Sequence, residues 1–352
     1  MRVISPLKRR RAFILLAAAF FLPACPRPGK TVYTIGILQL LESPTAREIR
    51  RGIVKALEDY GLRNGANIRL DVRDGLGDLS EVQRIARDFV TDRMDLIIAV
   101  TTPCLQAALI AAPKTPIVFT SVANPYLTRA GTAAANHLDN VTGVASTGPI
   151  RQTLVFVKEV LPSVRRVGTL WTPSELNSEY YLGLLRSAAD ELGLEIVTVP
   201  VANPNEVLLA SQVLINKRVD AIYQISDNTV NASFEALGQA AVEAGLPLFG
   251  GFLLSTRSGA CAAMGWDFFD MGYKTGSLAV RIKNGEKPAG IPFLSMSNVH
   301  LSLNPAAAAR QGIRFTEAVR KRAAEIVAED LPAGKTNGES ADGSAIRLPG
   351  AR

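Results

Sequence analysis

Apolar residues follow two different spacings along most of the chain. Short runs rich in Val, Ile and Leu have the length and composition of buried parallel strands. Between them, apolar side chains recur three or four residues apart, which is typical of a helix with one buried face. The strands predicted in this way are 33–38, 68–72, 96–100, 117–120, 164–171, 194–199, 219–225 and 247–249. The predicted helices are 49–60, 82–90, 181–192, 207–215 and 230–244.

This alternation occurs twice. Each half reads β-α-β-α-β-α-β, since strand 117–120 follows strand 96–100 at about the spacing of another βα unit. This order predicts a doubly wound parallel sheet with helices on both faces. We therefore expect an α/β protein with two such sheets in tandem, joined near residues 140–150. Residues 330–352 are rich in Gly, Ser, Asp and Pro and are expected to be disordered. Further elements that fit neither half are predicted as a helix at 270–284, strands at 292–296 and 299–303, and a short helix at 305–311.

The first 25 residues have the features of a lipoprotein leader. Five basic residues lie at or before position 11, and residues 12–22 form an apolar run that is too short to span a bilayer. Leu22-Pro23-Ala24-Cys25 then places a small residue before a cysteine. We expect residues 1–24 to be a signal peptide, Cys25 to carry a lipid and residues 25–31 to form a tether. An ordinary cleaved signal peptide with a chance cysteine is the alternative, and both Sec and Tat export stay open.

Charge and ligand chemistry exclude several classes of function. The chain carries +7, but five of its 39 basic residues and none of its 32 acidic ones lie in residues 1–24, so the remainder carries +2. This balance gives no support to nucleic-acid binding. His137 and His300 lie far apart without metal-ligand spacing, so no metal or cofactor is expected. Cys104 and Cys261 are either two buried thiols or one disulfide.

Polar side chains gather after the predicted strands of both halves. Ligands of open α/β sheets bind beyond the carboxyl ends of the strands, so two facing sheets would enclose a cleft. Helix N-termini there suit a carboxylate, Asp227 or Asp267 can pair with an ammonium group, and Trp266 can stack on an aromatic ring. Each polar side chain can instead cap the helix that follows it. The candidate ligand-binding residues are Gln39, Glu42, Thr101, Thr102, Ser121, Asn124, Asn177, Ser178, Asp227, Asn228, Trp266 and Asp267.

Many of these segments, taken in order, resemble a known family. From about residue 31 to residue 322, the chain is similar to the substrate-binding lipoproteins of ABC transporters whose known members bind aromatic amino acids such as tryptophan and tyrosine. The segments that carry the resemblance include Ile35-Gly36-Ile37, Gly77-Asp78-Leu79-Ser80, Pro116-Ile117-Val118-Phe119-Thr120, Asn140-Val141-Thr142-Gly143-Val144, Pro173-Ser174-Glu175-Leu176-Asn177-Ser178, Asp227-Asn228-Thr229-Val230, Gly265-Trp266-Asp267-Phe268-Phe269-Asp270-Met271-Gly272 and Gly285-Glu286-Lys287-Pro288.

The resemblance implies a type I periplasmic binding protein fold. Such a fold has two Rossmann-like lobes with parallel sheets and a hinge of several crossovers. Residues 32–147 with 266–297 would form the N-terminal lobe, and residues 148–265 with 298–324 the C-terminal lobe. Residues 325–352 would form a disordered tail.

Three positions depart from the pattern of the resembled family. Members usually carry Asp before the proline, where this chain has Asn124. An acidic residue often follows their Thr-Gly-Val-Ser segment, where this chain has Thr147-Gly148. Gly250-Gly251 stands in place of the Ser-Asp that usually follows the fourth strand of the second half. These replacements remove carboxylates and a hydroxyl from the predicted cleft, although a buried ammonium group needs a partner. Asp227 and Asp267 remain to serve that role.

The resemblance also implies a function without chemistry. We expect a monomeric, lipid-anchored receptor in the periplasm or cell envelope that captures a small organic solute, such as an aromatic amino acid or a relative. It would deliver the solute to an ABC permease in the inner membrane, which a separate ATPase drives. The same fold can instead signal to a histidine kinase or chemoreceptor. An exported enzyme is the third class, and no nucleophile elbow or His-centred constellation supports it.

Overall fold

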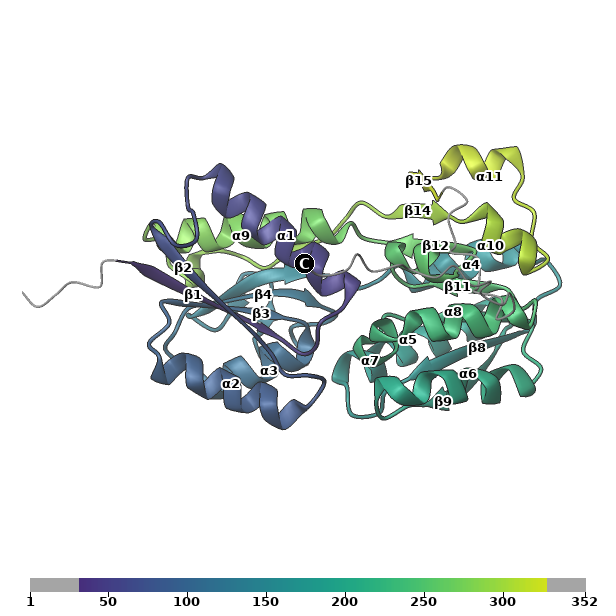
Figure 1. The fold of residues 1–352 in the computed structure, drawn as a ribbon, viewed down its shortest axis with the longest axis horizontal. Coiled ribbons are helices and arrows are strands. Elements are labelled where there is room, and N and C mark those ends of the chain that lie inside the picture. The colour runs from purple at the N-terminus through teal and green to yellow at the C-terminus, as the bar shows by residue number, and fades with distance from the viewer. Residues whose placement is uncertain (1–31, 328–352) are drawn as a thin grey trace, which may run out of the picture. The chain divides into compact units, whose positions relative to one another are not determined.

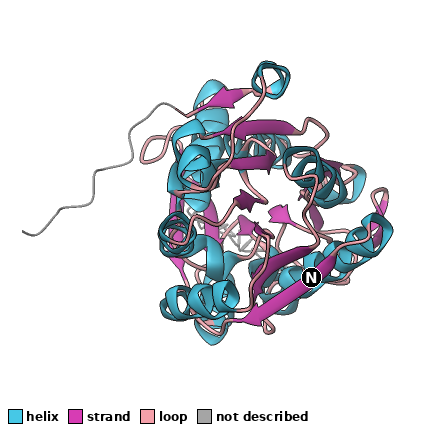
Figure 2. Ribbon diagram, turned by 90° about the vertical axis from the view of Figure 1, so that its right-hand side faces the viewer, coloured by secondary structure: helices cyan, strands magenta, loops and turns pink. Residues whose placement is uncertain are grey.

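The computed structural model describes residues 32–327 (Figure 1). The predicted signal peptide, the lipidation site Cys25 and the tether lie outside the described residues, as do residues 328–352. The described chain contains two large β-sheets and a small two-stranded one. Helices lie on the outside of the strands (Figure 2).

The first sheet has six strands, all parallel, in the order β13-β7-β4-β3-β1-β2. We name this sheet and the helices α1, α2, α3 and α9 the first lobe. Its strands are β1 (Tyr33–Gln39), β2 (Ile68–Asp74), β3 (Leu96–Val100), β4 (Ile117–Val122), β7 (Val141–Ala145) and β13 (Leu294–Ser295). Its helices are α1 (Pro44–Asp59), α2 (Leu79–Thr91), α3 (Thr102–Ala111) and α9 (Phe268–Lys283). The small sheet is the hairpin of β5 (Gly131–Ala133) and β6 (Asn136–His137).

The second sheet has seven strands in the order β15-β14-β12-β11-β10-β8-β9, and only the β12–β14 pair is antiparallel. We name it and its helices the second lobe. Its strands are β8 (Arg166–Trp171), β9 (Glu195–Pro200), β10 (Ala221–Gln224), β11 (Leu248–Gly250), β12 (Ala262–Gly265), β14 (His300–Leu303) and β15 (Glu325–Ile326). Its α-helices are α4 (Ile150–Val160), α5 (Leu176–Leu192), α6 (Val207–Asn216), α7 (Asn228–Ala232), α8 (Phe234–Glu243), α10 (Pro305–Arg310) and α11 (Glu317–Arg322). Short 3₁₀ helices are η1 (Pro204–Glu206) and η2 (Leu253–Ser258) in this lobe, and η3 (Pro288–Gly290) between α9 and β13 of the first lobe.

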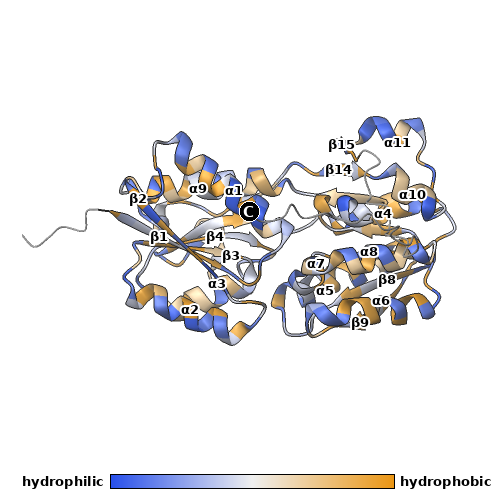
Figure 3. Cartoon of the chain, viewed as in Figure 1, coloured by the Kyte–Doolittle hydropathy of each residue, from blue (hydrophilic) through white to orange (hydrophobic). Residues whose placement is uncertain are grey.

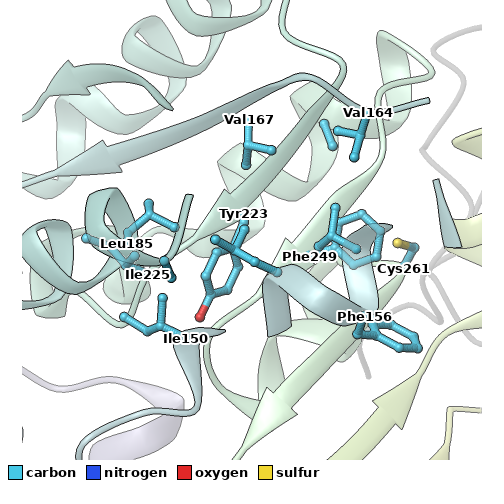
Figure 4. Close-up of a cluster of buried hydrophobic side chains, with 14 of the residues drawn as sticks. Ile150, Phe156, Val164, Val167, Leu185, Tyr223, Ile225, Phe249 and Cys261 are labelled. Carbon is cyan, nitrogen blue, oxygen red and sulfur yellow. The ribbon is translucent and has the colours of Figure 1, made fainter. Parts of the chain in front are cut away.

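Apolar side chains form separate cores on the faces of the two sheets, and apolar and polar residues alternate along the helices (Figure 3). One core of the second lobe surrounds Tyr223, Phe249 and Cys261 (Figure 4). Ile150 and Phe156 of α4 belong to this core, so the chain has already crossed to the second lobe by residue 150. The crossover therefore lies between Ala145, the last residue of β7, and Ile150.

After β12 of the second lobe, the chain returns to the first lobe through α9, which packs closely on α1. A Cβ atom at Gly272 would lie 2.0 Å from the backbone oxygen of Ile49, and one at Gly52 would lie 2.1 Å from that of Phe269. Real Cβ atoms do not approach backbone so closely, so glycine is required at both contacts. After α9, β13 pairs with β7 in the first sheet, and β14 then pairs with β12 in the second.

Several elements differ from the sequence predictions, which gave no range for α3, α4, β7 or α11 and began α1 at residue 49 rather than at Pro44. The predicted helix 230–244 is two helices, because Ser233 leaves the helical conformation (φ −120°, ψ 28°) between α7 and α8. Helix α5 begins at Leu176, five residues before its predicted start, so Asn177 and Ser178 lie in its first turn rather than in a loop. Residues 325 and 326, predicted to belong to the disordered tail, form β15, which is held by backbone hydrogen bonds to β14.

The two cysteines in the described chain are not paired. Cys104 and Cys261 are free and fully buried, one in each lobe. Burial raises the pKa of the Cys104 thiol and raises that of Cys261 to about 12. Both thiols are therefore protonated and shielded. Within residues 32–327, no helix is long and apolar enough to cross a membrane.

Candidate functional site

Two small pockets adjoin where carboxyl ends of strands from both sheets meet. They share Ser121, Ser226, Asn228 and Phe268, which come from both lobes and from the start of α9. None of the residues lining these two pockets is charged. The first pocket is lined by Gln39, Leu40, Leu41, Ser43, Thr45, Ala46, Ile49, Val100, Thr101, Ser121, Ser226, Asn228, Asn231 and Phe268. The second is lined by Ser121, Ala123, Ser146, Gly148, Asn177, Tyr181, Ser226, Asn228, Gly251, Trp266 and Phe268.

We call the two pockets together the cleft. Each has a volume of about 20 Å³, which is room for roughly one water molecule. The cleft is therefore closed in this conformation. An organic solute of the size of an amino acid can enter only after the two lobes separate.

Two residues of the first lobe hold strained backbone at the cleft. Thr101 has φ +83° and ψ 165°, and Ser121 has φ +55°, although neither is glycine. Thr101 precedes α3, and its side chain does not cap that helix. Ser121 lies where the register of β4 and β7 shifts. Such strain costs about 1–3 kcal/mol per residue, and these two are the strained non-glycine residues that line the cleft among the six with positive φ in the described chain.

Two buried carboxylates lie behind the second-lobe wall of the cleft. Glu175 accepts hydrogen bonds from the amides of Asn177 (2.9 Å) and Asn228 (2.6 Å), and from the hydroxyl of Thr229 (2.8 Å). Asp227 accepts from Thr172 N (2.8 Å), Ser178 Oγ (2.6 Å) and Val230 N (2.9 Å).

Neither carboxylate forms an ion pair among the described residues. Burial, together with the negative charge of Glu175, raises the pKa of Asp227 to about 7. The wall of the cleft is thus uncharged itself, but it is backed by carboxylates with no cation beside them. This arrangement favours a positive group on the solute side of the wall.

Several polar atoms at the cleft have no partner within residues 32–327. They are Oδ1 of Asn177, Oδ1 of Asn231 and Nε1 of Trp266, all shielded from solvent. The two asparagine oxygens can only accept hydrogen bonds, and the indole nitrogen can only donate one. Unpaired buried polar atoms are rare in native proteins, and a bound ligand is one of the explanations for them.

Phe268 contacts both lobes. It packs against apolar cores of the first and the second lobe, and its ring centroid lies 6.4 Å from that of Phe252. It also lines a third cavity of about 370 Å³ beside the crossover segments, together with Trp266 and Asp267. Asp267 caps α9 by accepting from Asp270 N at 3.1 Å. Phe268 and Trp266 line both the cleft and this third cavity, so these two side chains lie between them.

The structure brings six of the twelve predicted residues to the cleft: Gln39, Thr101, Ser121, Asn177, Asn228 and Trp266. Asp267 lines the third cavity. Glu42 forms surface ion pairs with Arg47 and Arg50, and Asn124 accepts from Tyr126 N in a turn. Thr102, Ser178 and Asp227 are buried behind the cleft. A role in binding solute stays a prediction for all twelve.

Sequence reasoning did not select several cleft residues. Ser226 and Phe268 stand in the polar segments considered, but Ser226 has the pattern of a helix cap and Phe268 that of core packing. Asn231 follows Asn228 by three residues on α7, which places the two side chains on one helix face. This three-residue spacing is the sequence signal from which Asn231 could have been predicted to accompany Asn228 at the cleft. Tyr181 and Ser146 gave no signal, because only the tertiary fold brings them together.

Two α/β lobes that close on an uncharged, polar and aromatic cleft define a solute-binding protein. The chain belongs to the family of ABC transporter substrate binding proteins, whose model matches residues 34–327. Members of this family act outside the cytoplasm and bind a solute without transforming it. Among residues 32–327 there is no group of three or more His, Cys, Asp or Glu side chains that could hold a metal ion.

The chain is 33% identical over 276 residues to a tyrosine-binding protein of Clostridioides difficile, covering 78% of this chain and 80% of that protein. It resembles the structure of a conserved domain protein from Vibrio cholerae, with a TM-score of 0.81, 30% identity, and 85% and 100% of the two chains covered. It also resembles an ABC domain from Streptococcus pneumonia in complex with L-Trp, with a TM-score of 0.80, 27% identity, and 84% and 100% covered.

A third solved structure, a ligand-free, open substrate binding protein from Clostridium difficile, gives a TM-score of only 0.63 at 30% identity, with 84% and 99% covered. The described chain thus matches the L-Trp complex better than the open structure, in agreement with its closed cleft. Likeness to a leucine-binding protein of Thermotoga maritima at 16% identity and a TM-score of 0.59 (81% and 98% of the two chains covered) confirms the predicted type I periplasmic binding fold.

Proposed function

We propose that this protein is the solute receptor of an ABC importer and captures an aromatic amino acid between its lobes. The observation that carries the proposal is the make-up of the cleft: polar groups of both lobes, free of charge, beside the aromatic rings of Phe268 and Trp266. A zwitterion with an aromatic side chain has no net charge. Its carboxylate and its ammonium group can bind the polar groups of the two lobes, and its ring can pack against Phe268 and Trp266. The ligands named for the tyrosine-binding relative and the L-Trp complex support the same class.

In this proposal the first lobe receives the carboxylate. Thr101 and Ser121 lie at the ends of β3 and β4, and α3 begins directly after Thr101. The N-terminus of a ten-residue helix carries partial positive charge and free N–H groups, which stabilise an anion. The strained backbone at both residues is accounted for if it aims these groups into the cleft.

The second lobe receives the ammonium group. Asn177, Asn228 and Asn231 present amide groups there, and Glu175 lies directly behind the amides of Asn177 and Asn228. The carboxylates predicted to pair with the ammonium group directly, Asp227 and Asp267, would then act at a distance or not at all. Phe268 and Trp266 would cover the ring of the solute.

Capture proceeds by closure. The solute would bind to an open form, and contacts from both lobes would then favour the closed form, because only that form makes both sets at once. The closed form would be presented to a permease in the inner membrane, with a separate ATPase as the energy source. A lipid on Cys25 would keep the monomeric receptor at the membrane.

Calorimetric titration of the purified chain from residue 26 onward tests the solute class. The titrants are tryptophan, tyrosine, phenylalanine, leucine and arginine. We expect binding by one or more of the aromatic amino acids, weaker binding by leucine, and none by arginine, whose extra charge finds no partner in the cleft. Ser121→Ala and Ser226→Ala should each lower the affinity about tenfold, while exposed Ser174→Ala should leave it unchanged.

Binding of leucine or arginine as tight as that of every aromatic amino acid would contradict the proposed solute class. The anchor needs a separate experiment, in which the full chain and its Cys25→Ser variant are expressed in a bacterium fed labelled palmitate. We expect label and membrane association in the first and neither in the second. Equal labelling of both would contradict the assignment of Cys25.

A further inference from the structure

The side-chain amides of Asn177 and Asn228 share one buried partner. Nδ2 of Asn177 lies 2.9 Å from Oε2 of Glu175, and Nδ2 of Asn228 lies 2.6 Å from the same oxygen. Glu175 is 2% exposed, and its other oxygen accepts from Thr229 N and Oγ1 at 3.1 and 2.8 Å. Every group that forms a hydrogen bond with this carboxylate is therefore a donor.

A carboxylate in this position fixes which way an amide points. An ionised carboxylate accepts hydrogen bonds and donates none, so each asparagine must turn its NH₂ group toward Glu175. The planar amide then turns Oδ1 away from Glu175. At Asn177 the result is visible: Oδ1 is buried, the residue lines the cleft, and no donor within residues 32–327 reaches that oxygen.

We propose that Glu175 is a positioning residue that turns the amide oxygens of Asn177 and Asn228 toward the cleft, and thereby selects solutes that carry a protonated amine. This inference rests on the proposed function and names a determinant of its selectivity. Glu175 itself does not line the cleft and touches no solute. It acts through Asn177 and Asn228, whose oxygens receive the N–H groups of the amine.

Replacement of Glu175 by Gln keeps the size and shape of the side chain. It removes the carboxylate that makes both asparagines turn their NH₂ groups toward position 175. A glutamine brings its own NH₂ group, which needs an acceptor, so an asparagine beside it must turn its oxygen inward and its NH₂ group toward the cleft. That NH₂ group repels an ammonium group. A solute that lacks the amine loses nothing by the change.

The test compares tryptophan with indole-3-propionate, which has the same ring and carboxylate but no amine. Dissociation constants are measured for the chain from residue 26 onward, for Glu175→Gln and for Glu179→Gln, an exposed glutamate one turn along α5. We expect the wild type and Glu179→Gln to prefer tryptophan by about a hundredfold. In Glu175→Gln, the affinity for tryptophan should fall about tenfold or more, whereas the affinity for indole-3-propionate should not change.

The ratio of the two affinities separates this role from a merely structural one, because a distorted cleft would weaken both ligands. An unchanged ratio in Glu175→Gln overturns the inference and leaves the proposed function in place. Failure of the wild type to bind any aromatic amino acid overturns both. If Glu175→Gln does not fold, Asn177→Leu replaces it, since loss of the accepting oxygen should narrow the same ratio, and an unchanged ratio there also overturns the inference.

Discussion

The hydroxyl of Tyr181 donates a hydrogen bond to the backbone oxygen of Ser146 at 2.8 Å and accepts one from Gly148 N at 3.3 Å. Tyr181 belongs to α5 of the second lobe, whereas Ser146 and Gly148 belong to the first crossover between the lobes. One buried side chain thus holds the segment about which the lobes would move.

We expect Tyr181→Phe to loosen this segment. The change leaves a buried carbonyl and a half-buried N–H group without their present partner, so the free energy of unfolding should fall by about 1–2 kcal/mol. Urea denaturation measures it. Tyr180→Phe, on the same helix but without a hydrogen bond to the crossover, is the control. Equal stability of the two variants would show that the hydroxyl of Tyr181 does not hold the crossover.

The buried carboxyl of Asp227 should make stability depend on pH. Its pKa in the folded protein, raised to about 7 by burial and by Glu175, exceeds the ordinary value of 3.8. Its contribution to stability is therefore full below about pH 4 and is lost as pH rises through about 7. The free energy of unfolding should fall across this window by an amount on the order of a few kcal/mol.

Asp227→Asn cannot ionise and should show a flatter pH profile between pH 5 and pH 8. Surface carboxylates such as Glu42, whose pKa is lowered mainly by its hydrogen bond to Arg50, lose their contribution only as the pH falls below their ordinary value, outside this window. Parallel profiles for Asp227→Asn and the wild type would refute the assignment.

Strain at Thr101 predicts opposite effects on stability and binding. Glycine adopts φ +83° freely, so Thr101→Gly should relieve about 1–3 kcal/mol of strain at an entropic cost of about 0.5–1 kcal/mol. We expect a higher melting temperature and weaker tryptophan binding. Arg129→Gly, at φ +66° on an exposed turn away from the cleft, should gain stability without loss of affinity. A destabilised Thr101→Gly would contradict the strain argument.

Packing of α1 on α9 predicts a sharp contrast between two glycines. In Gly272→Ala the new methyl group meets the backbone of Ile49, and the lost packing should cost about 1–3 kcal/mol or more. In Gly183→Ala, on α5, the methyl group meets nothing within 4 Å, and better helix propensity should gain about 0.5–1 kcal/mol. Thermal unfolding of both variants provides the comparison, and equal shifts would count against the close helix contact.

The sequence by itself determined the α/β class and the positions of most strands. Strand β1 begins at the predicted residue and ends one residue later than predicted, because a run this short and rich in β-branched residues favours a buried strand. It also placed polar side chains at the carboxyl ends of these strands. Thr101, Ser121 and Asn228 reach the cleft for that local reason.

Only the tertiary structure decided which polar residues face the cleft. Asp227 looked as available as Asn228, but donors from Thr172 and Ser178, about fifty residues away in the chain, enclose its carboxylate. The pairing of β15 with β14 likewise joins segments more than twenty residues apart. Periodicity reports local spacing, whereas burial of a charge depends on every group that packs around it, and that information is absent until the chain is folded.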